Sequence, residues 1–168
     1  MPKVEVEPCP QARKPALEAM FQLYVHDFSE HWSGTGRGEL AEDGRFPAYP
    51  YMDLYWKEPE RSAWLIRADG ALAGFALLNR FSHSGLPTDH DMAEFFVVRK
   101  HRRGGVGRQA ALELIGTRPG QWELAVARAN GGAMAFWRGV AAELSDEVET
   151  LDLSDDRWNG LILRFKVA

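Results

Sequence analysis

The chain of 168 residues contains one cysteine, no long apolar run and no surplus of basic residues. The single Cys9 excludes a disulfide within the chain, and we interpret it as a bystander thiol rather than a nucleophile. No segment approaches the ~18 consecutive apolar residues of a membrane span, and the first residues lack the apolar core of a secretory signal. We therefore expect a cytoplasmic protein with no membrane partner.

The charge balance also limits the choice of partner. A formal net charge of −4 argues against nucleic acid, because proteins that bind it usually carry a basic surplus. The basic residues are concentrated between Arg99 and Arg108, which indicates one bound polyphosphate. With 45% apolar residues, the chain is expected to form one domain over residues 1–168 with a sizeable core, and no metal site is expected.

The most informative stretch runs from Glu94 to Arg108, where an apolar strand leads into a glycine-rich, basic turn. Arg102, Gly105 and Gly107 have the spacing Arg-x-x-Gly-x-Gly, and glycines there let successive backbone N–H groups face one anion. An amphipathic helix is predicted after the turn, with its apolar stripe on Val106, Ala110, Ala111, Leu114 and Ile115. Its unpaired N–H groups and positive dipole end point at the turn, which predicts a pyrophosphate site.

Two other phosphate-binding motifs are absent. A dinucleotide fold requires Gly-x-Gly-x-x-Gly near the N-terminus with an acidic residue about 20 positions later. A Walker loop requires Gly-Lys-Ser/Thr at the end of the turn. Because glycines also occur at strand-to-helix junctions for steric reasons, the turn alone leaves the ligand open.

The elements that follow the turn resemble those of the GNAT superfamily of N-acetyltransferases. The helix is followed by Pro119 and Gly120, a β-rich run over 122–127, and Asn130 in an Asn-x-x-Ala helix, in the order of the family motif. The match is close over residues 91–140 and elsewhere concerns only the pattern of elements. The resemblance implies one α/β domain of the α+β type, with a mixed central sheet of about six to seven strands flanked by helices. It also implies direct transfer of the acetyl group of acetyl-CoA to an amine in a ternary complex.

The resemblance further implies which residues bind the coenzyme. The backbone of Phe96, Val97 and Val98 is expected to hydrogen-bond the pantetheine arm, and the Asn130 side chain to help hold it. Trp137 is expected to pack on the core or on the arm. The turn is expected to bind the pyrophosphate through Arg102, Arg103, Gly104, Gly105, Val106, Gly107 and Arg108.

Acyl transfer to an amine needs a base, a group that polarises the thioester carbonyl, and a proton for the leaving thiolate. Glu94 is the candidate base, because it precedes the pantetheine-binding stretch and shares a strand face with Phe96 and Val98. Many family members place a water-holding glutamate near this position. The alternative is that Glu94 begins the strand in solvent or pairs with Arg80 or Arg99. The N–H of Val97 or Val98 is expected to polarise the carbonyl.

The proton donor is where the sequence departs from the family. Many members have a tyrosine at the position of Trp137, whose indole N–H is not a useful acid at neutral pH. Either the thiolate leaves unassisted, given a pKa of about 8.5 for model thiols, or another group substitutes, with Tyr51, Tyr55, His83 and His90 as candidates. The missing tyrosine also supports an alternative function, a catalytically weak acetyl-CoA-binding sensor. A phosphate- or nucleotide-binding domain with a different ligand is a second alternative.

The acceptor is expected to bind to the segments that match the family least, residues 29–42 and 49–60. The candidates for a cage around a cationic amine are Tyr49, Tyr51, Tyr55 and Trp56, with Asp53 and Glu58 as counter-charges. The alternative is a short helix with buried aromatic side chains, because several of these residues lie at helical spacing. The acceptor remains a small cationic amine or a peptide or protein amine. Many members of the superfamily are dimers, so a homodimer also stays open.

Further elements follow from apolar periodicity. A helix is predicted over about 14–30, with Pro15 in its first turn. Strands are predicted over 63–68 and 72–79 around Asp69 and Gly70, a strong hairpin signal. A loop is predicted over 82–90, and a final strand pair over 147–152 and 161–167.

Overall fold

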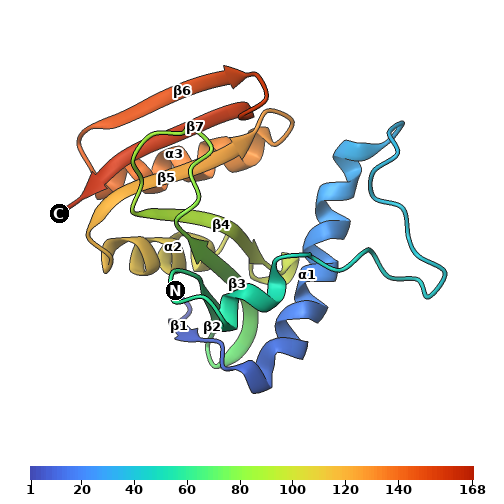
Figure 1. Cartoon of the computed structure of the whole chain (residues 1–168). Coiled ribbons are helices and arrows are strands. Elements are labelled where there is room, and N and C mark those ends of the chain that lie inside the picture. Colours follow the sequence, from blue (N-terminus) through green and yellow to red (C-terminus); the bar gives the residue numbers. More distant parts are fainter.

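A seven-stranded mixed sheet with the order β1-β2-β3-β4-β5-β7-β6 forms the frame of the computed structural model, which describes residues 1–168 (Figure 1). The strands are β1 Val4–Pro8, β2 Ser62–Ala68, β3 Ala71–Asn79, β4 His90–Val97, β5 Gly120–Ala127, β6 Val148–Ser154 and β7 Asn159–Val167. The α-helices are α1 Lys14–Ser29, α2 Val106–Gly116 and α3 Gly131–Leu144. Short 3-10 helices are η1 Gln11–Arg13, η2 Glu30–Trp32, η3 Met52–Trp56 and η4 Arg99–His101. The predicted single α/β domain with a mixed sheet is confirmed.

Strand β1 is the element that periodicity did not predict. Val4 and Val6 alternate with Glu5 and Glu7, and the strand pairs antiparallel with β2 at the edge of the sheet. Five residues are too few for the alternation to stand out, so the pairing partner decides the structure.

The predicted hairpin of β2 and β3 is present and turns at Asp69 and Gly70. Both residues have left-handed backbone angles, with φ of 49° and 81°, which suit a two-residue hairpin turn. Gly74 lies where β3 approaches β4 most closely. A Cβ on Gly74 would lie 2.0 Å from the carbonyl oxygen of Phe96, so only glycine fits there.

The helices cover the two faces of the sheet. α2 and α3 pack on one face, against Ala76, Leu78, Met92, Trp122 and Phe165. α1 and η3 pack on the other face, against Leu65, Phe75, Leu77 and Phe96. The long segment between α1 and η3 stands out beside α1, away from the sheet (Figure 1). Each face of the central strands therefore has its own apolar layer.

The one parallel contact in the sheet lies between β4 and β5, and it is short. These strands pair only at His90 with Trp122 and at Asp91 with Glu123. Beyond that point β4 pairs only with β3, and β5 only with β7. We call the two facing edges of β4 and β5 beyond Asp91 and Glu123 the fork. Its backbone groups have no strand partner.

Candidate active site

A β-bulge in β4 turns Glu94 toward α1. Leu77 pairs with Glu94 and Leu78 with Met92, so Ala93 has no partner on β3. Met92 packs in the core under α2 and α3. In a regular strand Met92 and Glu94 would lie on the same face, and the extra residue places Glu94 on the opposite one. The predicted shared face with Val98 is confirmed, since Val98 packs on the α1 side.

The Glu94 carboxylate is half-buried at the rim of the fork and accepts one hydrogen bond, from the Tyr24 hydroxyl at 2.5 Å. Burial raises the pKa of Glu94 to about 7, although the hydrogen bond from Tyr24 opposes the rise. Neither alternative partner reaches it, because Arg80 lies near other carboxylates and Arg99 pairs with Asp27. A carboxyl with a pKa near 7 exchanges protons readily at neutral pH.

The backbone of β4 divides its N–H groups between β3 and the fork. The Val98 N–H donates to the Ala73 carbonyl on β3 at 2.8 Å. Because backbone direction alternates along a strand, Phe96 also faces β3, whereas Phe95 and Val97 face the fork. The expectation that the backbone of Phe96 and Val98 holds a ligand is therefore corrected, since β3 already uses it. Val97 is left as the N–H available to a thioester carbonyl.

The glycine-rich turn has the shape that its sequence predicts. Arg103 and Gly105 both have left-handed backbone angles, with φ of 66° and 85°. Gly105 is the N-cap of α2, and no side chain caps the helix, so the first N–H groups of α2 remain available to an anion. Gly104 lies between them with open space around its Cα, and Val106 and Gly107 form the first turn of α2.

Arg102 links the turn to α1. Its Nε donates to the Val97 carbonyl at 2.7 Å, and its guanidinium pairs with Asp27. Arg99 donates to the same carboxylate at 2.8 Å. Burial raises the pKa of Asp27, but the bonds to both arginines outweigh this and leave it below its usual value. The Arg102 side chain therefore fastens α1 to the edge of the fork.

Arg108 is also occupied. It forms two hydrogen bonds with Glu143 of α3, one of them from Nε at 2.6 Å, and so joins α2 to α3. No protein carboxylate pairs with Lys100 or Arg103. Of the basic residues near the turn, these two are the cations that remain free for a phosphate.

Asn130 and Trp137 both belong to α3. Asn130 is the N-cap, and its side-chain oxygen accepts a hydrogen bond from the Ala133 N–H at 3.3 Å. Trp137 packs edge-to-face against Phe95 and Phe136, with ring centroids at 5.1 and 4.8 Å. The expected packing of Trp137 on the core is confirmed. The indole therefore lies on the face of β4 opposite Glu94.

Two of the tyrosines predicted to cage an amine face a cation of the protein itself, because the Arg61 guanidinium lies 5.9 Å from the ring centroid of Tyr51 and 5.4 Å from that of Tyr55. Tyr51 is 52% exposed, Asp53 pairs with Lys14, and Tyr55 is 4% exposed and accepts a hydrogen bond from Asn79 at 3.1 Å. Arg61 therefore already occupies the place between Tyr51 and Tyr55, and the segment forms the short helix η3 with Tyr55 buried, as the alternative predicted. Helical spacing brought Tyr55 to the core and left Tyr51 at the surface.

A groove of about 480 Å³ lies instead between α1 and the segment 36–50. Its lining is largely aromatic and apolar, from Phe21, Val25, Trp32, Phe46, Pro47 and Tyr49. Phe21 stacks on Tyr49 at 4.8 Å and contacts Tyr24 edge-to-face at 5.3 Å. Phe21 therefore connects the groove to Tyr24, whose hydroxyl donates to Glu94.

None of the four predicted proton donors contacts Glu94. Tyr51 is the N-cap of η3 and Tyr55 lies within η3. The His83 ring packs on Trp158 with ring centroids 4.6 Å apart, and His90 Nε2 lies 3.0 Å from the Pro119 carbonyl oxygen. Tyr24, which does contact Glu94, lies among the apolar residues of α1 that face the sheet. Its apolar neighbours in the sequence masked a hydroxyl that reaches another element.

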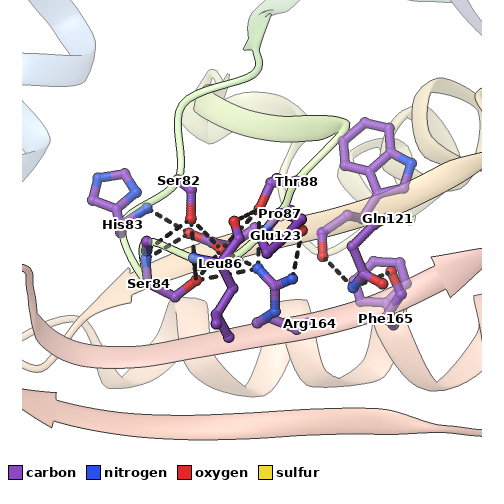
Figure 2. Close-up of polar contacts among 12 residues, drawn as sticks. Ser82, His83, Ser84, Leu86, Pro87, Thr88, Gln121, Glu123, Arg164 and Phe165 are labelled. Carbon is purple, nitrogen blue, oxygen red and sulfur yellow. Dashed lines mark hydrogen bonds and ion pairs between the residues drawn. The ribbon is translucent and has the colours of Figure 1, made fainter.

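A second carboxylate, Glu123 on β5, lies at the closed end of the fork, where β5 pairs with β4 (Figure 2). It is fully buried and accepts hydrogen bonds from the loop 82–88 and from Arg164 Nη1 at 2.5 Å. The loop donates from Ser82 Oγ, the His83 N–H, the Ser84 N–H and Oγ, and Thr88 Oγ1. Glu123 therefore anchors the predicted loop 82–90.

Other candidate features carry no site. Cys9 is buried, and burial raises the pKa of its thiol, which disfavours the reactive thiolate. No group of three or more His, Cys, Asp or Glu side chains has the arrangement needed to hold a metal ion. Among the helices, none combines the length and the apolar character of a membrane span.

Comparisons with known proteins agree with this geometry. The model of the Acetyltransferase (GNAT) family matches residues 17–141, which is most of the chain. No curated protein sequence matches it. An acetyltransferase from Thermus thermophilus is 15% identical, with a TM-score of 0.67 over 98% of this chain and 97% of that chain.

Two solved structures that contain coenzyme A have the same fold. The PaiA N-acetyltransferase from Thermoplasma acidophilum, in complex with coenzyme A, is 12% identical, with a TM-score of 0.60 over 98% of this chain and 99% of that chain. The spermidine N-acetyltransferase from Vibrio cholerae, in complex with CoA and spermine, is 11% identical, with a TM-score of 0.59 over 98% and 95%. At these identities the likeness concerns the fold, and the family match decides the assignment. The chain belongs to the GNAT family of acetyltransferases.

Proposed function

We propose that the chain is an acetyl-CoA-dependent N-acetyltransferase that transfers the acetyl group directly to an amine in a ternary complex. One observation carries the proposal. Glu94, with a pKa of about 7, lies at the rim of a fork whose edge ends in an anion-binding turn. A base and a polyphosphate site at opposite ends of one free strand edge suit a thioester attached to a long phosphorylated arm.

The coenzyme is assigned to the fork and the turn. The left-handed residues Arg103 and Gly105 and the first turn of α2 present backbone N–H groups to the pyrophosphate, with Lys100 and Arg103 as free cations. The pantetheine arm lies along the free edge of β4, where the Phe95 backbone groups face the fork, because the Val97 carbonyl is already used by Arg102. Asn130, at the start of α3, has its side-chain N–H groups available to the arm, since only its oxygen is used in capping.

The chemistry is assigned to β4. Glu94 removes a proton from the attacking nitrogen, directly or through a water molecule, because an ammonium has no lone pair with which to attack. The Val97 N–H polarises the thioester carbonyl and stabilises the negative charge that develops on its oxygen. Both groups are supplied by one rigid strand that is fixed on both faces by helices.

The acceptor is assigned to the groove beside α1. Its aromatic lining suits a primary amine on an apolar or aromatic body. Its two charged residues, Arg37 and Glu39, cancel formally, and the Arg37 guanidinium stacks on Trp32 at 4.5 Å. A polyamine is disfavoured, because its second ammonium would meet a guanidinium and a single carboxylate.

The first test is calorimetric titration of the protein with acetyl-CoA, desulfo-CoA and ADP at two salt concentrations. We expect micromolar binding of acetyl-CoA, weaker binding of ADP, and weakening by salt. Release of free thiol is then followed with 2-phenylethylamine, spermidine and short peptides as acceptors, with 2-phenylethylamine expected to react fastest. Binding without turnover of any acceptor would favour the sensor alternative. Absence of acetyl-CoA binding would favour a domain for another phosphorylated ligand.

A further inference from the structure

The C-terminal end of α1 leaves the sheet and carries one wall of the groove. Up to Tyr24 and Val25 the helix packs on the apolar layer of its face of the sheet. Beyond them, Phe28 packs on Trp32 of η2, with ring centroids 6.3 Å apart, and is not part of that layer. This end of α1 and the segment after it stand away from the strands (Figure 1). The groove wall at Trp32 therefore lies on a part of the chain that does not pack on the sheet.

Asp27 attaches this part of α1 to the chain just after β4. Its Oδ1 accepts a hydrogen bond from Arg99 Nη2 at 2.8 Å, and its Oδ2 accepts one from Arg102 Nη2. The Arg102 guanidinium also lies 5.6 Å from the ring centroid of Phe96 and donates from Nε to the Val97 carbonyl. A single exposed ion pair contributes little to stability, but here two arginines share one carboxylate that is only 23% exposed. We call Asp27, Arg99 and Arg102 the clamp.

The clamp also reduces the positive charge beside the glycine-rich turn. Arg102 is the first residue of the turn motif, and Arg99 lies three residues before it. Asp27 places a negative charge within hydrogen-bonding distance of both guanidinium groups. A negative charge beside a polyphosphate site repels the phosphate groups, and salt screens the repulsion. The clamp therefore supports the groove and opposes the binding of an anion at the turn.

Glu143 is a matched carboxylate on the other side of the turn. It accepts two hydrogen bonds from Arg108 and so reduces the positive charge of the same turn. It belongs to α3, which lines no part of the groove. Asp27 and Glu143 thus have the same electrostatic effect on the turn, but only Asp27 also holds α1.

We propose that Asp27 is a positioning residue that couples the two substrate sites, because it holds the acceptor wall of α1 in place and weakens the binding of the coenzyme polyphosphate. The inference rests on the proposed function, which assigns the acceptor to the groove and the coenzyme to the turn. Loss of the carboxylate frees Arg99 and Arg102 for phosphate groups and releases the end of α1. Affinity for the coenzyme therefore rises, while the acceptor site loses its shape.

The test measures the two sites separately. Affinities for acetyl-CoA and ADP come from calorimetric titration at two salt concentrations, and KM and kcat come from thiol release with 2-phenylethylamine as acceptor. Asp27→Asn keeps the size of the side chain and removes its charge. We expect acetyl-CoA and ADP affinity to rise about three- to tenfold at low salt and less at high salt. The KM for the amine should rise at least about tenfold, with kcat within about threefold of the unmodified protein.

Two further variants separate the charge of Asp27 from its attachment of α1. Glu143→Gln should raise acetyl-CoA affinity to a similar extent and leave the KM for the amine unchanged. Arg99→Met removes one bond of the clamp and one cation, so it should raise that KM without raising acetyl-CoA affinity. Because the Arg99 side chain is 74% exposed, this variant is expected to fold even if Asp27→Asn does not.

Three results would overturn the coupling or its basis. An unchanged KM for the amine in Asp27→Asn would show that Asp27 only neutralises charge, as Glu143 does. A fall in acetyl-CoA affinity in Asp27→Asn would show that the clamp builds the coenzyme site instead of opposing it. Absence of thiol release by the unmodified protein with any acceptor would overturn the proposed function, whereas failure of the coupling alone leaves that turnover intact.

Discussion

Two carboxylates beside the fork are held in opposite conditions, Glu123 at its closed end, where β4 and β5 pair, and Glu94 on its open part, which runs along β4 toward the turn. At the closed end Glu123 is fully buried but is surrounded by donors from the loop 82–88 and by Arg164 (Figure 2). At the open end Glu94 is less buried but has one donor, the Tyr24 hydroxyl. Burial raises both pKa values. At Glu123 the hydrogen bonds outweigh burial and leave the pKa below its usual value, whereas at Glu94 it rises to about 7.

The difference separates structural from chemical carboxylates. A carboxylate that is saturated with donors stays ionised and holds elements together. A buried carboxylate with few donors can accept further hydrogen bonds and has a pKa near the ambient pH. These are the properties of a general base. Between them lies Asp91, which is 1% exposed, with no hydrogen-bond partner on either oxygen. Burial raises the pKa of Asp91 well above its usual value. Asp91 therefore resembles Glu94, and not Glu123, in the direction of its pKa shift.

The largest expected effect breaks the closed end. Arg164→Met removes the one cation paired with Glu123 and leaves a buried, unpaired charge. We expect a loss of about 3–5 kcal/mol in the free energy of unfolding, measured by urea denaturation at about pH 8. Arg80→Met is the control, because its ion pairs with Glu60 and Asp89 are exposed and long, at 3.8 and 3.9 Å, and should contribute less than about 1 kcal/mol. A loss for Arg164→Met no larger than that of the control would refute a structural role for Glu123.

The next effect breaks the open end without unfolding it. Glu94→Gln keeps the shape of the side chain and removes the base. We expect kcat to fall by at least about 100-fold, with acetyl-CoA affinity within about twofold of the unmodified protein. Glu149→Gln, an exposed glutamate on β6, is the control. Full turnover by Glu94→Gln would exclude Glu94 as the base, and lost acetyl-CoA affinity would indicate a role in binding.

The contrast between the two ends also explains what the sequence could predict. The turn was predictable because its residue 105 adopts a left-handed backbone angle, which glycine adopts without strain, and the sequence has a glycine there. Most helices and strands were predictable from apolar periods. Glu94 was predictable because it lies on the motif strand, and its face followed from the two-residue period, which the bulge at Ala93 does not disturb on that side.

Contacts between distant segments were not predictable. Tyr24 is 70 residues from Glu94, and nothing in its local pattern distinguishes it from a core aromatic. Arg102 and Arg108 have the positions of phosphate ligands in the sequence, but Asp27 and Glu143 pair with them in the fold. A sequence does not show which carboxylate each cation will pair with, so only the structure shows which cations are free.

A smaller effect tests the turn, which lies beyond Val97 at the opposite end of the free β4 edge from Glu94. Gly105→Val places a β-branched residue at φ of 85°, a conformation that only glycine adopts without strain. We expect acetyl-CoA affinity to fall at least about tenfold in calorimetric titration, because the N–H groups at the start of α2 lose their arrangement. Gly139→Ala, in the middle of α3 with open space around it, should leave the affinity unchanged. Unchanged affinity in Gly105→Val would mean that the coenzyme binds elsewhere.

The smallest effect distinguishes the two carboxylates by the pH dependence of folding. Because the pKa of Glu94 is raised in the fold, the folded state holds its proton more tightly than the unfolded chain. Stability should therefore fall as pH rises from about 4.5 to 7, by on the order of 1–2 kcal/mol. Glu123, with a lowered pKa, contributes in the opposite direction, and its contribution is lost as pH falls through its folded pKa.

Denaturation at about pH 5 and about pH 8 separates these contributions. Relative to the unmodified protein, Glu94→Gln should gain stability at about pH 8 compared with about pH 5, because it no longer buries the Glu94 charge at the higher pH. In the unmodified enzyme kcat/KM should rise with pH up to about 7 and level off as Glu94 ionises. If Glu94→Gln showed no such gain at the higher pH, the ionised Glu94 carboxylate would be as well stabilised as that of Glu123. The raised pKa on which its role as a base depends would then be wrong.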